Sequence, residues 1–146
     1  PLQFEPLYNE EMVLVVAKKH PLARRKRVRM VELHRLPMVL LPGSFATRQM
    51  LDECFRSCGA QPHVVAEINT LAPMMDLVAK TQLASIMAAN VVTAQSGLVV
   101  VRLESPTPVR TPGMLWSPVA RDAAATRAFS TIVRKLALRS SLQGTQ

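Results

Sequence analysis

The chain has 146 residues, 49% of them apolar and 19% charged, and its 18 Lys and Arg outnumber its 10 Asp and Glu to give a formal charge of +8. This composition is typical of a globular α/β protein and argues against an intrinsically disordered chain. The longest apolar runs, such as residues 12–17, reach about six residues, far short of the roughly 20 of a transmembrane helix, which excludes a membrane-spanning protein.

The first predicted strand covers residues 11–19 (EMVLVVAKK), a short run rich in β-branched side chains. A strongly basic segment follows, in which eight Lys and Arg face one acid, Glu32, for a net +7 between residues 18 and 35. Such cations can neutralise phosphates, or they can simply keep a surface loop solvated. We interpret the segment as a solvated loop, and its lack of aromatic side chains gives no support for single-strand recognition.

The remaining elements alternate between strands and helices. A β-rich run predicts a strand, and apolar residues at i, i+3, i+4 and i+7 predict a helix. The predicted strands are residues 36–41, 63–68, 83–87, 98–103 and 113–117, and the predicted helices are residues 46–58, about 70–80, 88–95 and about 122–136.

This order predicts a mostly parallel sheet flanked by helices. Ligands of such sheets bind beyond the carboxyl ends of the strands. Two strand-to-helix turns, residues 42–47 and 67–70, bring hydroxyl or amide side chains to helix starts, where unpaired N–H groups favour a carboxylate or small anion. Helix capping by Ser44 and by Asn69 or Thr70 is the structural alternative.

No sequence motif points to catalysis or to a metal. There is no phosphate-binding glycine loop and no nucleophile elbow. The three His (20, 34 and 63) lie apart and are interpreted as surface residues. Cys54 and Cys58 fit neither a redox nor a zinc spacing and are interpreted as reduced packing thiols. We therefore expect no cofactor, no metal and no enzymatic activity.

Three segments, residues 7–23, 36–80 and 121–133, resemble the effector-binding region of LysR-type transcriptional regulators. Within this family, Ser44–Phe45–Ala46–Thr47–Arg48 and the turn at residues 67–70 are most similar to regulators of cyanate utilisation. The start at Pro1, with no Met, predicts a fragment of a longer protein or a processed chain.

The resemblance implies an α/β fold like that of a type II periplasmic binding protein, with one complete subdomain and part of a second. Residues 19–106 would form subdomain II, and residues 1–18 and 107–146 would form part of subdomain I with the crossover strands. An N-terminal winged helix-turn-helix, outside this chain, would bind promoter DNA. The implied protein is a cytoplasmic dimer or tetramer without a membrane partner. A transport solute-binding protein of the same fold is the alternative.

The resemblance also places a small-molecule effector, which we expect to be anionic, in a cleft between the subdomains. The implied ligand-binding residues are Ser44, Phe45, Thr47, Asn69, Thr70 and Met87.

The last predicted helix carries one apolar face, which includes Phe129, Ile132 and Leu136. In the family pattern this face packs on elements outside the chain. We expect either exposed apolar surface here or burial of these three side chains against a covering partner.

Overall fold

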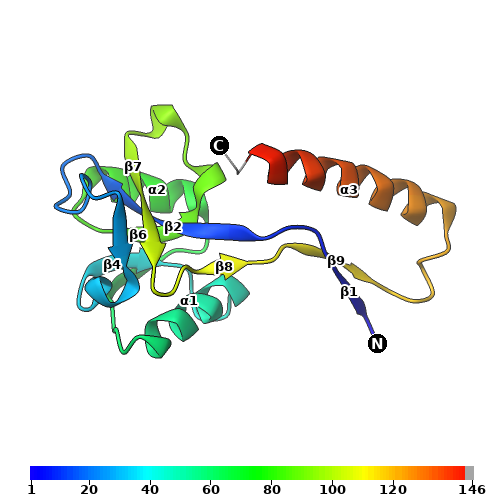
Figure 1. Cartoon of the computed structure of the whole chain (residues 1–146), viewed down its shortest axis with the longest axis horizontal. Coiled ribbons are helices and arrows are strands. Elements are labelled where there is room, and N and C mark those ends of the chain that lie inside the picture. The colour runs from blue at the N-terminus through cyan, green and yellow to red at the C-terminus, as the bar shows by residue number, and fades with distance from the viewer. Residues whose placement is uncertain (144–146) are drawn as a thin grey trace. The chain divides into compact units, whose positions relative to one another are not determined.

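The computed structural model describes residues 1–143 and divides into two compact units (Figure 1). Unit 1 comprises Pro1–Glu10 with Thr111–Gln146, and unit 2 comprises Glu11–Arg110. The chain thus leaves unit 1, forms the whole of unit 2 and returns to unit 1.

Strand β2 (Glu10–Ala17) runs through unit 2 and pairs antiparallel with β6 (Ser85–Ala88) on one side and with β7 (Leu98–Glu104) on the other. Strand β3 (Arg27–Arg29) extends the sheet as an edge strand parallel to β7. The expectation of a mostly parallel sheet is therefore wrong. Alternation along the sequence fixes direction only for strands joined by a direct crossover, whereas β2 pairs with strands distant from it in the chain.

A direct crossover does occur between β4 (Pro37–Leu40) and β5 (His63–Glu67), which are parallel and joined by α1 (Ala46–Ser57). Backbone hydrogen bonds between β4 and Ala84 connect this pair to the start of β6. The carboxyl ends of β4, β5 and β6 consequently lie along one edge of unit 2, which is the edge that sequence analysis predicted for ligand binding.

The two helices of unit 2 cover opposite sides of its strands (Figure 1). Successive β2 side chains point to opposite faces: Leu14 and Val16 join a core with Leu51 and Phe55 of α1. Val13 and Val15 join a second core with Met74 and Val78 of α2 (Leu71–Lys80). Burial on both faces explains why β2 is a continuous apolar run.

Two expectations for the short elements of unit 2 are wrong. The helix predicted at 88–95 is instead two 3-10 turns, Ala89–Val91 and Ala94–Ser96, because Val91, Val92 and Thr93 form a β-branched run that disfavours a longer helix. The basic segment also contains β3, which the sequence did not predict, and the 3-10 turn Met30–Leu33, which agrees with the short helical turn that the sequence predicts at residues 30–35. A three-residue strand is too short to produce a periodic signal. The three prolines of residues 104–112 predict a connector, whereas Val109–Arg110 forms strand β8, which pairs with β2.

His20 was expected at the surface but is 6% exposed. Its Nδ1 accepts a hydrogen bond from the Leu22 amide at 3.0 Å, and burial lowers the pKa of its imidazole. His34 and His63 are exposed as predicted. Cys54 and Cys58 are free thiols, in agreement with the sequence analysis.

Unit 1 contains the antiparallel pair β1 (Gln3–Pro6) and β9 (Gly113–Trp116), followed by the long helix α3 (Ala124–Gln143). A Cβ atom at Gly113 would lie 2.3 Å from the Phe4 ring and 2.5 Å from the Glu5 carbonyl oxygen. Only glycine therefore allows this close approach of the two strands.

The apolar face predicted for the last helix is exposed, with Phe129, Ile132 and Leu136 at 63%, 58% and 55%. The expected burial of these three side chains is wrong, whereas the alternative expectation of exposed apolar surface is confirmed. The buried positions of α3 are instead Ser130 and Ala137, two small residues seven apart. Helical periodicity identified the apolar face but could not say whether a partner covers it.

Candidate functional site

A small cavity of about 30 Å³ lies in unit 2 at the edge where the parallel strands end. It is enclosed by the first turns of α1 and α2 and by β2, β6 and β8. Its lining residues are Met12, Leu41, Thr47, Leu71, Met74, Ile86, Met87, Ala88, Val91 and Arg110. The walls are mainly apolar, with the Thr47 hydroxyl and the Arg110 guanidinium as polar groups. An apolar hollow with a few polar groups is the usual form of a small-ligand site.

Two of the six predicted site residues line this cavity. Thr47 is half-buried in the first turn of α1, and Met87 is 2% exposed in β6. The other four are exposed: Ser44 and Phe45 directly precede α1, and Asn69 and Thr70 directly precede α2. These four residues lie beside the same two helix starts but do not line the cavity. Leu71, which follows Thr70, lines it instead.

Neither helix start at this edge has a side-chain cap. The N-cap of α1 is Phe45, so the expectation that Ser44 caps this helix is wrong. Thr70 is the N-cap of α2, but its hydroxyl makes no capping hydrogen bond. Amides of a first helical turn have no partner within the helix and carry the positive end of the helix dipole. Both ends can therefore receive hydrogen-bond acceptors or negative charge.

Arg48 joins the two turns. Its guanidinium donates to the Leu41 carbonyl at 2.7 Å, to Glu67 Oε2 at 2.8 Å and to Asp52 Oδ1 at 2.9 Å. Burial lowers the pKa of Arg48, but the two carboxylates outweigh this effect and raise it. The Arg48 guanidinium keeps its positive charge, and the Asp52 and Glu67 carboxylates balance that charge. Arg48 therefore holds the ends of β4 and β5 to α1 rather than attracting a ligand.

Sequence reasoning missed Arg48 and Arg110 as contributors to this region. The i, i+4 spacing of Arg48 and Asp52 was a usable signal for a helix-surface pair. No local signal could identify Arg110, because it reaches the cavity through the pairing of β8 with β2.

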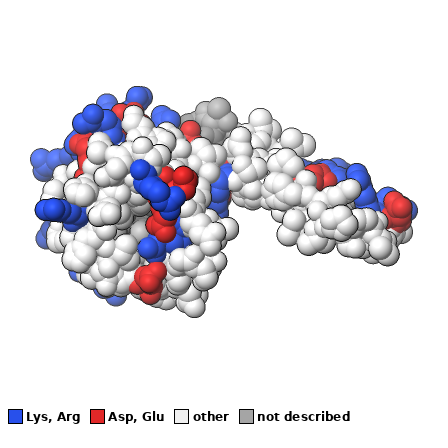
Figure 2. Space-filling view, turned by 90° about the horizontal axis from the view of Figure 1, so that it is seen from below, with Lys and Arg blue, Asp and Glu red and all other residues white. Residues whose placement is uncertain are grey.

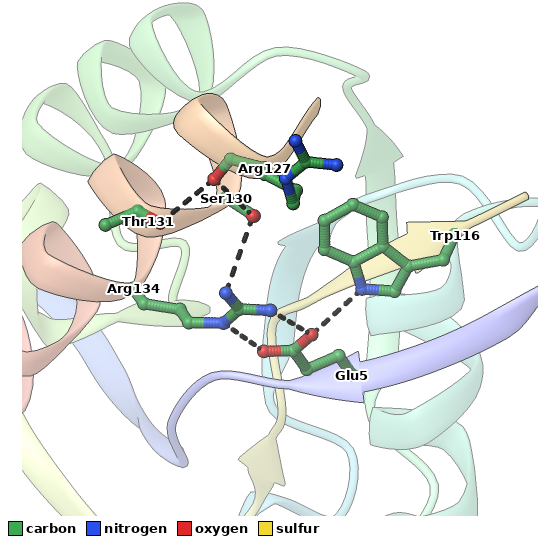
Figure 3. Close-up of polar contacts among 6 residues, drawn as sticks. All are labelled: Glu5, Trp116, Arg127, Ser130, Thr131 and Arg134. Carbon is green, nitrogen blue, oxygen red and sulfur yellow. Dashed lines mark hydrogen bonds and ion pairs between the residues drawn. The ribbon is translucent and has the colours of Figure 1, made fainter. Parts of the chain in front are cut away.

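A larger hollow of about 290 Å³ lies in unit 1, lined by Trp116, Arg121, Asp122, Arg127, Ser130, Thr131 and Arg134. Figure 3 shows that Arg134 is connected to Ser130 and, through Glu5, to Trp116. Arg134 binds Glu5 through two hydrogen bonds, and the Trp116 indole N–H donates to the same carboxylate at 2.9 Å. Arg134 also lies 5.9 Å from the Trp116 ring centroid, a cation–π distance.

The ion pair of Arg134 with Glu5 lies within unit 1. The hydrogen bond from Arg134, helped by Trp116, lowers the pKa of Glu5 to about 2. We interpret the cluster as the polar attachment of α3 to the β1–β9 pair. Sequence analysis did not foresee it, because its partners are separated by more than 100 positions.

Residues 1–143 contain no cluster of three or more His, Cys, Asp or Glu that could hold a metal ion. Over the same residues, no helix combines the length and apolar character that crossing a membrane requires.

Comparison with known proteins places the chain in a family of regulatory domains. The family described as "LysR substrate binding domain" matches residues 1–137. The chain is 29% identical over 126 residues to the uncharacterized HTH-type transcriptional regulator YybE of Bacillus subtilis, covering 82% of this chain and 43% of that protein. It thus spans less than half the length of this relative.

Two solved structures share the fold. The regulatory domain of CcmR from Synechocystis PCC6803, in complex with 2-PG, superposes with a TM-score of 0.82 at 16% identity, covering 93% of this chain and 67% of that chain. The effector-binding domain of QuiR, in complex with shikimate, also gives a TM-score of 0.82, at 21% identity, covering 94% and 66%. These likenesses show the type II periplasmic-binding-protein-like fold expected from the sequence.

Proposed function

Because this chain belongs to the family of LysR substrate-binding domains, we propose that it is the ligand-sensing part of a bacterial LysR-type transcriptional regulator. In this role it binds a small effector and thereby controls transcription. The effector complexes of the CcmR and QuiR domains support the proposal. The solute-binding alternative is not favoured, because the matched family is that of regulators.

We propose that the effector contacts the edge of unit 2 where α1 and α2 begin. The observation that carries this is the cavity lined jointly by Thr47 and Met87, which come from elements 40 positions apart. In our proposal Ser44, Thr47, Asn69 and Thr70 supply hydrogen bonds, Phe45 forms a wall, and Met87 forms the floor.

An anionic effector fits this edge best. Two helix starts without side-chain caps supply positive potential, and few acids lie at the same turns. Glu67, the acid nearest in sequence, is paired with Arg48. A small anion such as cyanate is consistent with this charge balance and with the similarity to regulators of cyanate utilisation.

The rest of the proposed regulator follows the family pattern. Residues 19–106 correspond to subdomain II, and residues 1–18 and 107–146 to part of subdomain I with the crossover strands. Residues 11–18 and 107–110 of this second set lie in unit 2 with subdomain II. A winged helix-turn-helix elsewhere in the protein would bind promoter DNA. We further propose a cytoplasmic dimer or tetramer with no catalytic activity of its own.

Calorimetric titration tests the site, with sodium cyanate and simple carboxylates as ligands for this chain and, in parallel, for the longer regulator. We expect saturable binding of one anion and roughly tenfold weaker binding in Thr47→Val and Thr70→Val, the loss of about 1.4 kcal/mol for one hydrogen bond. Thr131→Val in unit 1 is the matched control and should bind normally. Unchanged affinity in both Ser44→Ala and Thr70→Val would remove those residues from the site, and no binding of any anion would overturn the anionic effector.

A further inference from the structure

The basic segment of unit 2 forms an ordered, positively charged surface outside the cavity. We define this basic edge as Lys18, Lys19, Arg24, Arg25, Lys26, Arg27, Arg29 and Arg35, all eight of which are exposed. Figure 2 shows Lys and Arg side chains gathered at the end of unit 2 where the loop after β2 lies in Figure 1.

Acidic side chains balance only part of this charge. Glu32 pairs with Arg25 and Arg29 at 3.2 and 3.8 Å, and Glu104 pairs with Arg27 at 3.8 Å. A neighbouring pair, Arg102 with Glu11, adds no net charge. Within residues 1–143, no ion pair involves the other five members of the edge, which are Lys18, Lys19, Arg24, Lys26 and Arg35.

The backbone holds these cations in place. Consecutive turns follow β2, with hydrogen bonds from the amides of His20, Ala23 and Arg25 to carbonyls three residues earlier. Val28 and Met30, each fully buried, anchor the following stretch in the core. An ordered backbone lowers the entropy that binding would otherwise cost. The edge is therefore a prearranged surface, in contrast to the solvated loop expected from the sequence.

The composition of the edge selects the type of polyanion. Single-stranded nucleic acid is bound by aromatic side chains that stack on bases, and the edge has none. Membrane surfaces are bound by cations together with several inserted apolar side chains, whereas Val31 is the one exposed large apolar residue in the segment 18–35. Cations alone suit the phosphate backbone of a duplex, which is contacted without reading bases.

We propose that the basic edge of unit 2 contacts the phosphate backbone of duplex DNA, so that the sensing domain itself adds to the affinity of the regulator for its promoter. The proposal takes the nearness of DNA from the proposed function, but it assigns this contact to a surface other than a DNA-binding domain.

No member of the edge lines the cavity. Met12 of β2 does line it. Lys18 and Lys19 directly follow the end of β2 that is remote from Met12, whereas Arg27 lies level with Val13 across β7, because both pair with Arg102. Five residues of strand separate Met12 from Ala17, a distance of about 16 Å. A bound effector and bound DNA would therefore not compete for the same residues.

Fluorescence anisotropy with a labelled 20-bp duplex tests the proposal on this 146-residue chain between 50 and 200 mM salt. We compare a Lys18→Ala, Lys19→Ala, Arg24→Ala, Lys26→Ala variant with a control carrying Arg56→Ala, Lys80→Ala, Lys135→Ala and Arg139→Ala. Both variants lose four positive charges from exposed positions, so each lowers the net charge of the chain by the same amount. Thermal melting by circular dichroism establishes that both are folded.

We expect the edge variant to bind at least tenfold more weakly at 50 mM salt and to lower the slope of log K against log salt by about 2 to 4. The control variant should retain most of the parent chain's affinity for the duplex and most of its salt dependence. Equal losses in the two variants, or no duplex binding by the parent chain, would overturn the proposal. Preferential binding to phosphatidylserine vesicles over duplex would also overturn it. In calorimetric titration, the edge variant should bind small anions with the same affinity as the parent chain. A failure of the proposed DNA contact is therefore distinguishable from a failure of the proposed effector site.

Discussion

Arg48 and Glu67 form an ion pair of 2.8 Å between the first turn of α1 and the end of β5. The Arg48 side chain is 14% exposed and the Glu67 side chain 49%. The same guanidinium nitrogen binds the Leu41 carbonyl that follows β4. One side chain therefore fixes the relative positions of both strand ends that border the proposed effector site.

Arg48→Ala should reduce stability by about 1 to 3 kcal/mol, because it leaves a half-buried carbonyl and a carboxylate without their donor. Urea unfolding at pH 7 measures this loss. The control is Arg56→Ala, an exposed residue of the same helix whose pair with Glu53 lies in solvent, and it should change stability by less than about 0.5 kcal/mol. Equal effects of the two substitutions would show that Arg48 has no special structural role.

The Glu5 carboxylate should keep its charge to unusually low pH. Its pKa is about 2 in the folded chain, against 4.5 as the ordinary value. The folded state therefore binds this proton less readily than the unfolded state, and the stabilising contribution is present above pH 4.5 and lost as pH falls toward 2. Trp116, the single Trp, donates to this carboxylate, so its fluorescence reports the change. Glu5→Gln should shift the acid transition, whereas a normal carboxyl midpoint in the parent chain would contradict the assignment.

His20 should make the chain less stable in mild acid. Burial lowers the pKa of the folded imidazole below its ordinary 6.5, so below about pH 6.5 the unfolded state takes up a proton that the folded state does not, and stability falls with pH. The urea midpoint should decrease between pH 7 and 5. His20→Asn keeps a hydrogen-bond acceptor for Leu22 and should flatten this dependence, while the exposed His63→Asn should not. A decrease of the same size in His20→Asn would rule out His20 as its source.

Truncation of two phenylalanines on different helices should reduce stability by very different amounts. Phe55 of α1 is 2% exposed, whereas Phe129 of α3 is 63% exposed. Phe55→Ala should cost about 3 to 5 kcal/mol through lost burial and a residual cavity, and Phe129→Ala should cost less than about 0.5 kcal/mol. Thermal unfolding of both variants measures the difference. A large loss in Phe129→Ala would mean that another surface covers this face of α3 in solution.

The sequence by itself determined the features that depend on local periodicity. A β-rich run identified β2, β4, β5 and β7, and helical periodicity identified α1, α2 and α3. The predicted ends are within a few residues of the observed ones, except that α3 continues to Gln143, beyond the predicted end at residue 136. The two strand-to-helix turns followed from the same patterns. The family and its fold also followed from the sequence, because residues near these turns carry the resemblance.

Only the tertiary structure decided which elements meet. Strand direction in the sheet depends on the pairing of β2 with β6 and β7, and such non-local pairing leaves no periodic trace in either strand. The same is true of the cavity that brings Thr47 and Met87 together and of the contact between Glu5 and Arg134. Burial of His20 and the ordered backbone beneath the basic edge depend likewise on the core against which the segment packs. A local pattern specifies which side of an element is apolar, but only the packed chain decides what that side contacts.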